Sequence, residues 1–411
     1  MKPISHFAIL LSNKVDKEEL IHRLFSGKIT GKLNVFNNVK GVLFSDLAIA
    51  DFLEEEHKHH TIEITKAEKR QLNTFSSGER RKAYLEYCLA QNPDYIIFDN
   101  PLDHLDYQSR KDLLKRLTEL SKTISIIELV NRKESFLPFI KNRWFIKDNN
   151  FKLTEVPKII ETSQKIFKAD IPNSLLAFNN DYKSVVELNN VSVSYNDTVI
   201  VKDVNWSVSK GEFWQLIGPN GSGKSTILSL ITGDNPKAYG QNIYIFGHKK
   251  GSGESIWDLK KRIGYFSTNL TELFKRNHTV EQMILSGFYD SIGLYQEASD
   301  LQKQKVNEWL RIIKMSEFKN FYFNRLNLGQ QRLILIIRAL VKQPPLLILD
   351  EPIEGLDQEN SDLVIQLINT LINKTDITII YVSHTIEKGL SPSNIYELIP
   401  TQNGSIGKLK S

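Results

Sequence analysis

The chain has 411 residues, of which 41% are hydrophobic and 25% charged, the composition of a globular protein rather than a disordered one. At roughly 100–200 residues per domain, this length predicts two domains or three. The 53 basic and 48 acidic residues leave a net charge of only +5, too small to indicate nucleic-acid binding. The single cysteine excludes an internal disulfide and a multi-thiolate zinc site, and indicates a reducing compartment.

The sequence also argues against membrane insertion. No stretch approaches the ~18–20 uninterrupted apolar residues that a spanning helix needs. The first residues, MKPISHFAILLSNKVDKEE, contain a short apolar run before charges resume, so we expect neither a signal peptide nor an anchor there. We therefore expect a soluble, cytoplasmic protein.

An internal repeat organises the chain. Residues 75–106 and residues 326–357 align without a gap and share nine of 32 positions. Each segment runs from a loop through a helix and a proline turn into a buried apolar strand and an acidic loop. The sequence therefore predicts two related α/β halves.

The two halves are unequal. We predict a domain over residues 1–150, a linker over residues 151–184 with one helix near residues 157–167, and a domain over residues 185–411. The first half lacks the opening strands that VVELNNVSVSY (residues 185–195) predicts in the second.

Residues 54–60, EEEHKHH, hold three histidines. Their spacing fixes no metal geometry, so we expect an exposed helix tip there rather than a metal site.

Tyr195 ends the first strand-like run of the second half. An aromatic residue in an early strand usually belongs to the core. Its place 29 residues before Lys224 favours the alternative, a ring that stacks on adenine.

A phosphate-binding loop follows the apolar strand 213–217. Residues 218–226 read GPNGSGKST, which fits G-x-x-x-x-G-K-[ST], and lead into a predicted helix over Thr226–Ile231. Glycines let backbone N–H groups converge on an anion, and a helix N-terminus adds the positive end of its dipole. Lys224 is predicted to reach the β- and γ-phosphates, and the hydroxyl of Ser225 to ligate Mg²⁺. The predicted nucleotide contacts are Gly218, Asn220, Gly221, Ser222, Gly223, Lys224, Ser225 and Thr226.

Two later strands carry further candidates. The buried strand Leu346–Asp350 ends in a carboxylate, which is predicted to be the second Mg²⁺ ligand. Glu351 follows at once and is placed to deprotonate an attacking water. His384 follows the predicted strand Ile377–Val382; a histidine at a strand end is usually structural, but its position favours contact with the γ-phosphate.

Together, the phosphate loop, a glycine loop before a helix (residues 326–330), LLILDEP and GLD (residues 346–357) and His384 resemble the ABC ATPases in tandem form. The resemblance implies two P-loop ATPase domains with mainly parallel sheets and helical inserts, the N-terminal one truncated and degenerate. It implies that the domains pair head to tail, with ATP between the phosphate loop of one and the signature loop (family form LSGGQ) of the other. ATP and Mg²⁺ are the implied cofactors, and a permease on a separate chain is the implied partner.

The N-terminal half departs from the family pattern where it would bind phosphate. Ser12–Glu19 reads SNKVDKEE, with Lys17 in the place of the phosphate-loop lysine and carboxylates that would repel phosphate. Asn100 stands at the position of the base and cannot take a proton. No histidine occurs over residues 130–133, where His384 would have its equivalent.

The signature loops show the opposite pattern. Residues 75–79, FSSGE, stay close to the family form and leave Ser76, Ser77 and Gly78 available to a nucleotide, whereas residues 326–330, LNLGQ, have lost the serine and one glycine. The losses therefore fall into one composite site and leave the other intact. The alternative is an N-terminal half that serves only as a packing partner.

Within the family, four stretches resemble the ModF (PhrA-like) group associated with molybdenum transport: residues 227–236, 251–267, 285–296 and 329–342. We therefore expect an ATPase at the inner face of the plasma membrane that energises or regulates a transporter, with molybdenum or a related oxyanion as cargo. Thr268 stands near the place of a glutamine that the family uses to meet Mg²⁺ and sense its partner, which counts against coupling. The alternatives are a soluble ABC-F-like translation factor, usually built with a longer basic linker, and a nucleotide-sensing regulator.

Overall fold

The computed structural model forms two compact units, residues 1–163 with 355–358 and residues 164–354 with 359–411. It describes residues 4–12, 15–59, 75, 77–103, 105, 107–156, 171–175, 178, 181–253, 255–268, 270, 274, 277–384 and 386–410. The linker helix predicted near residues 157–167 lies outside these residues. Across the described ranges, every helix is too short or too polar to cross a membrane.

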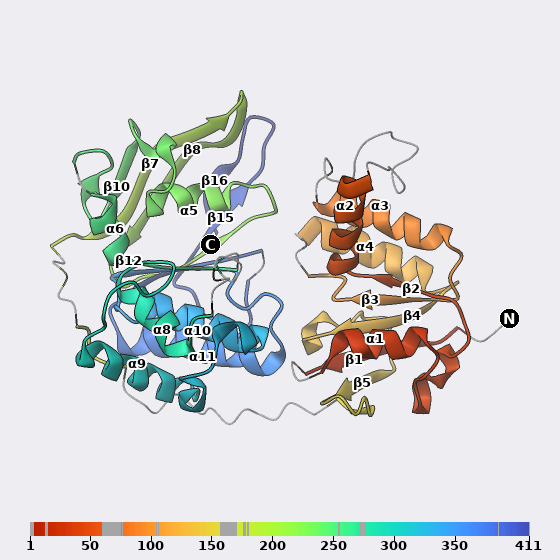
Figure 1. The fold of residues 1–411 in the computed structure, drawn as a ribbon. Helices are drawn as coiled ribbons and strands as arrows, with labels where there is room; N and C mark the ends of the chain where they lie inside the picture. Colours follow the sequence, from red (N-terminus) through yellow and green to blue (C-terminus); the bar gives the residue numbers. More distant parts are fainter. Residues whose placement is uncertain are drawn as a thin grey trace. The chain divides into compact units, whose positions relative to one another are not determined.

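The first unit is built on a six-stranded sheet with the order β2-β3-β4-β1-β5-β6, in which β6 runs antiparallel to β5 and the other pairs are parallel (Figure 1). Its strands are β1 (His6–Leu11), β2 (Gly41–Phe44), β3 (Tyr95–Asp99), β4 (Ser125–Val130), β5 (Arg143–Ile146) and β6 (Thr154–Glu155). Its helices are α1 (Lys17–Phe25), α2 (Asp46–His59), α3 (Ser77–Ala90) and α4 (Tyr107–Leu120), with 3₁₀ turns η1 (Gly31–Phe36) and η3 (Lys133–Ser135).

Helices cover both faces of this sheet, which explains why its strands are apolar throughout. Side chains alternate along a strand, so Ile9 and Leu11 of β1 pack with α1 on one face, while Ala8 and Leu10 pack with α3 and α4 on the other (Figure 1).

The second unit contains a six-stranded sheet with the order β12-β13-β14-β9-β15-β16 and a four-stranded antiparallel sheet with the order β11-β10-β7-β8. The strands of the first sheet are β9 (Phe213–Ile217), β12 (Ile263–Ser267), β13 (Leu346–Asp350), β14 (Thr378–Ser383), β15 (Asn394–Ile399) and β16 (Ile406–Lys410). Those of the second are β7 (Ser184–Tyr195), β8 (Thr198–Ser209), β10 (Asn242–Ile245) and β11 (His248–Lys249).

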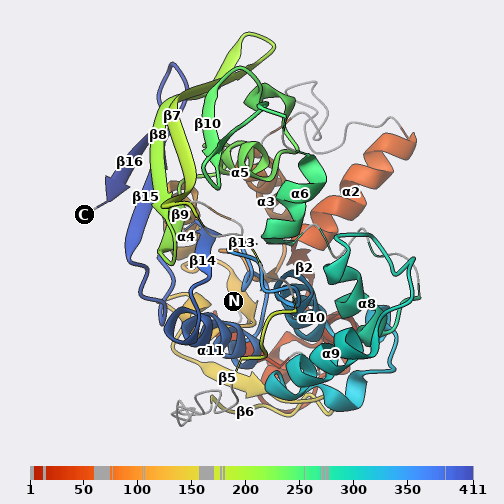
Figure 2. The same ribbon diagram turned by 90° about the vertical axis from the view of Figure 1, so that its left-hand side faces the viewer.

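The helices of the second unit are α5 (Lys224–Thr232), α6 (Ile256–Arg262), α8 (Val280–Leu285), α9 (Asp300–Ile312), α10 (Leu328–Leu340) and α11 (Gln358–Lys374). Its 3₁₀ turns are η4 (Pro236–Ala238), η5 (Ser286–Phe288), η6 (Ser316–Phe318) and η7 (Phe323–Arg325). Helices α8, α9 and α10 pack together as the helical insert (Figure 2).

The two six-stranded sheets have the same strand order and directions when β1 is matched with β9 and β3 with β13. The matched helices α1 and α5 each have nine residues and begin at Lys17 and Lys224. This agreement confirms the predicted pair of related α/β folds. Among the residues that the structure describes, the first unit has no counterpart of the four-stranded antiparallel sheet.

Element boundaries were predicted with small errors. The strands at residues 213–217 and 346–350 have the predicted bounds, and the strand predicted over Ile377–Val382 is shifted by one residue. The helix predicted to begin at Thr226 begins at Lys224, because Gly223 in a left-handed conformation starts the helical turn directly behind the loop.

Candidate active site

The phosphate-loop motif joins β9 to α5 in the second unit. Gly221 and Gly223 have φ angles of 75° and 91°, a left-handed conformation that glycine adopts without strain. A Cβ atom on Gly223 would lie 2.5 Å from Cγ1 of Val201, whereas one on Gly221 would have nothing within 4 Å. In the part of the chain that the structure describes, no side chain caps α5 by a hydrogen bond, so its N-terminal end is open to an anion.

The amine of Lys224 is held inside the loop. Its Nζ donates to the carbonyl oxygens of Gly218 at 2.7 Å and Pro219 at 3.1 Å, and lies 3.3 Å from Nδ1 of His384. The side chain is only 8% exposed. The motif lysine and the predicted histidine, distant in sequence, therefore meet.

Three neighbouring strands bring the other candidates to the same edge of the sheet (Figure 2). Asp350 at the end of β13 pairs with Val382 of β14, so Glu351 and His384 both lie just beyond the strand ends. Nε2 of His384 is 2.6 Å from Oε1 of Glu351. Glu351 has a φ of 53°, a conformation that costs free energy in a residue with a side chain and is common at functional sites.

The two adjacent carboxylates have opposite pKa shifts. Burial, reinforced by the charge of Glu351, raises the pKa of Asp350 to about 6. Burial alone would raise the pKa of Glu351 too, but hydrogen bonds with His384 and Glu354 and the charge of Lys224 outweigh it and lower that pKa. Glu351 is therefore ionised at neutral pH and able to accept a proton.

Glu354 was missed by sequence reasoning. One ligand atom each from Glu351, Glu354 and His384 lie within 4.8 Å of one another. Its place in the turn after Asp350, which ends β13, is the sequence feature from which it could have been proposed.

The remaining predicted contacts lie around the loop. Ser225 is exposed at the start of α5, and Thr268 follows Ser267, which pairs with Asp350. Tyr195 is 43% exposed, and its hydroxyl accepts a hydrogen bond from Nδ2 of Asn235 at 2.8 Å. Its ring is thus accessible rather than enclosed in the core.

The matching place in the first unit is filled by the protein's own charges. The Asp16 carboxylate caps α1 by accepting from the N–H of Glu19 at 3.0 Å. Nζ of Lys17 lies 2.7 Å from Oδ1 of Asp99, the equivalent of Asp350. An incoming phosphate would have to displace the cap and break the ion pair. Asn13 and Lys14 lie outside the described residues.

The backbone around Asn100 nevertheless matches that around Glu351. Asn100 has a φ of 44°, and its N–H donates to the carbonyl of Leu129 at 2.9 Å, as that of Glu351 donates to Val382 at 3.0 Å. Asn131 occupies the position of His384 and donates its N–H to Oδ1 of Asn100. The backbone geometry of the turn is the same in both units, but the first unit has the amides Asn100 and Asn131 where the second has Glu351 and His384.

The signature loops both lead into helices. Ser76 lies outside the described residues, Ser77 begins α3 and Gly78 follows it. In the second unit, Asn327 caps α10, accepting from the N–H of Gln330 at 2.9 Å. The residue in the place of the signature serine is thus engaged in the cap.

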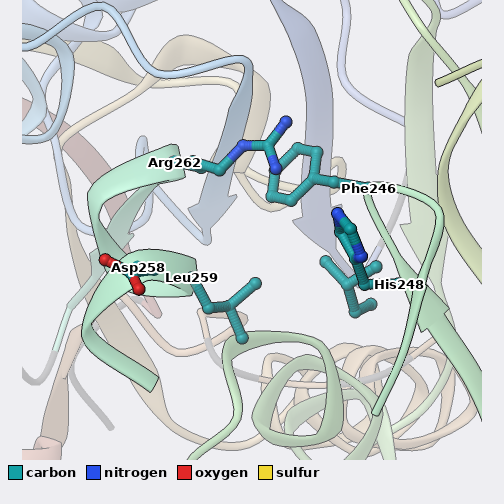
Figure 3. A pocket seen from close by; sticks show the side chains of 6 residues that line it. Phe246, His248, Asp258, Leu259 and Arg262 are labelled. Carbon is teal, nitrogen blue, oxygen red and sulfur yellow. The ribbon is translucent and has the colours of Figure 1, made fainter. Parts of the chain in front are cut away.

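A separate pocket of about 150 Å³ lies beside α6 (Figure 3). The guanidinium of Arg262 lies 4.2 Å from the centre of the Phe246 ring. The pocket is lined by Ile245, Phe246, His248, Asp258, Leu259 and Arg262. Because none of the predicted site residues lines it, this pocket is distinct from the cluster at the strand ends.

Comparison with known proteins decides the family. The family model described as ABC transporter matches residues 201–354. The ABC transporter ATP-binding protein ModF of Escherichia coli is 40% identical over 340 residues, which cover 79% of this chain and 69% of that protein. The chain belongs to the ABC transporter ATP-binding proteins.

Further similar proteins match part of the chain. An uncharacterized ABC transporter ATP-binding protein of Schizosaccharomyces pombe is 28% identical, covering 76% of this chain and 65% of that protein. The zinc uptake system ATP-binding protein ZurA of Listeria monocytogenes is 34% identical, covering 50% of this chain and 78% of its own length. The solved dimeric structure of the bacterial ABC transporter cassette MJ0796 is 25% identical, covers 52% of this chain and 93% of the MJ0796 chain, and has a TM-score of 0.44.

As a member of this family, the chain is an ATPase. ABC ATPase domains bind and hydrolyse ATP, generally with Mg²⁺, and ABC ATP-binding proteins typically pair with membrane permeases.

The two loop glycines give a matched test of the phosphate-loop geometry. Gly221→Ala should cost about 1–2 kcal/mol of unfolding free energy, the strain of a left-handed backbone. Gly223→Ala should cost about 1–3 kcal/mol more, because its Cβ atom overlaps Val201. Urea unfolding followed by tryptophan fluorescence measures both, since four of the five tryptophans lie in the second unit. Equal costs would contradict the loop geometry.

Proposed function

We propose that the chain hydrolyses Mg-ATP at a single competent site built on the phosphate loop of its C-terminal half. The observation that carries the proposal is the contrast between two equivalent lysines. Lys224 is held by carbonyl oxygens at an open helix end, whereas Lys17 is neutralised by Asp99 beside a helix end that Asp16 closes.

Each residue then has a distinct task. Lys224 contacts the β- and γ-phosphates, Glu351 accepts the proton of the attacking water, and His384 contacts the γ-phosphate. Ser225 and Asp350 hold Mg²⁺, which supplies charge stabilisation to the transferred phosphoryl group. The loop contacts are Gly218, Asn220, Gly221, Ser222, Gly223 and Thr226, with Tyr195 stacked on the adenine.

The N-terminal half completes the site in this proposal. Domains over residues 1–150 and 185–411, joined by the linker 151–184, pair head to tail so that Ser76, Ser77 and Gly78 meet the nucleotide. The support is the distribution of losses: the phosphate-binding residues are lost in one half and the signature residues in the other. In this proposal the two domains close on ATP and reopen after hydrolysis, and this movement is what acts on a partner protein.

The ATPase energises or regulates a transporter whose membrane permease is a separate chain. The similarity to ModF supports this role and a peripheral position at the cytoplasmic face of the membrane. A molybdenum-related oxyanion cargo rests on that similarity alone. Thr268 in place of the family glutamine favours the second candidate, a nucleotide-sensing regulator.

Glu351→Gln tests the proposed base. Turnover should fall by at least about 100-fold, because the amide cannot accept a proton, while ATP affinity is retained. Phosphate release measures turnover, and equilibrium binding of ATP measures the affinity. Asn100→Gln, the matched change in the first unit, should leave turnover within about two-fold of wild type; a large loss there would refute the one-site model.

Ser76→Arg tests the composite site. The bulky cation at the N-terminal signature should reduce turnover by at least about 100-fold, although it lies far from the phosphate loop in sequence. The control is Leu328→Arg in the C-terminal signature, a 43% exposed residue that this proposal assigns to the other, inactive composite site. Unaffected turnover in Ser76→Arg, or equal losses in both, would show that the halves do not share a site.

Partner capture tests the transport role. Glu351→Gln, held with ATP in a detergent extract of its native cells, should co-purify with an integral membrane permease. Lys224→Ala in the same extract is the control, because it should not hold ATP. Recovery of ribosomal proteins and RNA would indicate the translation-factor alternative. If neither a permease nor ribosomal components are recovered, the result would favour the nucleotide-sensing regulator.

A further inference from the structure

We propose that Glu351, Glu354 and His384 form a binding site for a divalent transition-metal cation of the zinc class, separate from the Mg²⁺ ligands Ser225 and Asp350. One ligand atom from each of the three side chains lies within 4.8 Å of the others. In the described residues, no other three such side chains converge in this way.

The fold holds these three side chains in place from two directions. Glu351 and Glu354 lie in the turn after β13, and the guanidinium of Arg332 on α10 donates to the carbonyl oxygen of Glu354 and so anchors that turn. His384 enters from the end of β14, with Nε2 2.6 Å from Oε1 of Glu351. The side chains of His384 and Glu351 are only 15% and 21% exposed, so solvent screens the carboxylates poorly.

The donor set matches zinc rather than magnesium. Two carboxylate oxygens and one imidazole nitrogen, with water as the fourth ligand, make a usual tetrahedral zinc site, whereas Mg²⁺ prefers six oxygens. A cation bound by Glu351 and Glu354 would replace the hydrogen bond between their two carboxyl groups.

The neighbouring lysine does not prevent this arrangement. Metal binding through Nε2 of His384 leaves the ring proton on Nδ1, which faces Nζ of Lys224 at 3.3 Å. Because Nδ1–H and the ammonium are both donors, their contact would be lost on metal binding, and the lysine would keep only its two carbonyl acceptors, those of Gly218 and Pro219.

The first unit provides an internal comparison. Arg81 donates to the carbonyl oxygen of Asp103 as Arg332 donates to that of Glu354, so the turn is built in the same way. The side chains at the three equivalent positions are Asn100, Asp103 and Asn131. The fold alone therefore does not require two carboxylates and a histidine there.

Bound zinc would engage Glu351, the proposed base, and His384, the proposed γ-phosphate contact, and would therefore stop hydrolysis. This inhibitory consequence rests on the proposed function, whereas the binding itself does not.

The first test measures binding of Zn²⁺ alone to the nucleotide-free full chain by calorimetry. Glu354→Gln keeps the size of the side chain but should weaken zinc binding at this site by at least about 10-fold. Glu359→Gln, an exposed glutamate five residues further on, should bind zinc as the wild type does. The histidines of residues 54–60 are unchanged in all three proteins, so the difference isolates this site. Equal zinc affinity in Glu354→Gln and wild type would overturn the proposal.

The second test measures Mg-ATP turnover against added Zn²⁺. With the turnover of each protein expressed relative to its own zinc-free rate, Glu354→Gln should need at least about 10-fold more zinc than wild type for half inhibition. If the chain hydrolyses no ATP but binds zinc in a Glu354-dependent way, the metal site stands and the proposed function fails. If it hydrolyses ATP and Glu354 makes no difference to zinc binding, the metal site fails and the proposed function stands.

Discussion

The N-terminal end of the helix after the first parallel strand is the constraint on which the chemistry of this protein depends. Such an end presents unpaired N–H groups and the positive end of a dipole, which a side-chain cap, water or a bound anion can satisfy. In one unit the carboxylate of Asp16 does so, and in the other Gly223 leaves the end open. The same sheet order therefore carries one closed and one open anion site.

The neighbouring strands extend this contrast. In the first unit Asp99 neutralises the lysine that begins the helix, and Asn100 accepts a backbone N–H group. In the second unit Lys224 stays within reach of His384, which in turn meets Glu351. The two units thus keep the same backbone at this turn, although Glu351 and His384 of one are replaced by amides in the other.

Much of the phosphate loop could be predicted because its residues are contiguous. The motif 218–226 specifies its own turn, and the strands at residues 213–217 and 346–350 are confirmed with their predicted bounds. The sequence puts Glu354 in the turn after β13, but its approach to Glu351 and His384 could not be predicted, because that approach depends on a turn anchored by Arg332 and on the end of a different strand.

The sequence by itself determined the two related α/β halves, the phosphate loop and the inequality between the halves, since these reside in local patterns and in an internal repeat. Only the tertiary structure decided that Lys17 pairs with Asp99, that Lys224 lies beside His384, and that Glu354 lies beside Glu351 and His384. Those contacts join residues far apart in the chain or across a turn. Their distances follow from the order of the strands in the sheet, which depends on pairing between segments far apart in the chain.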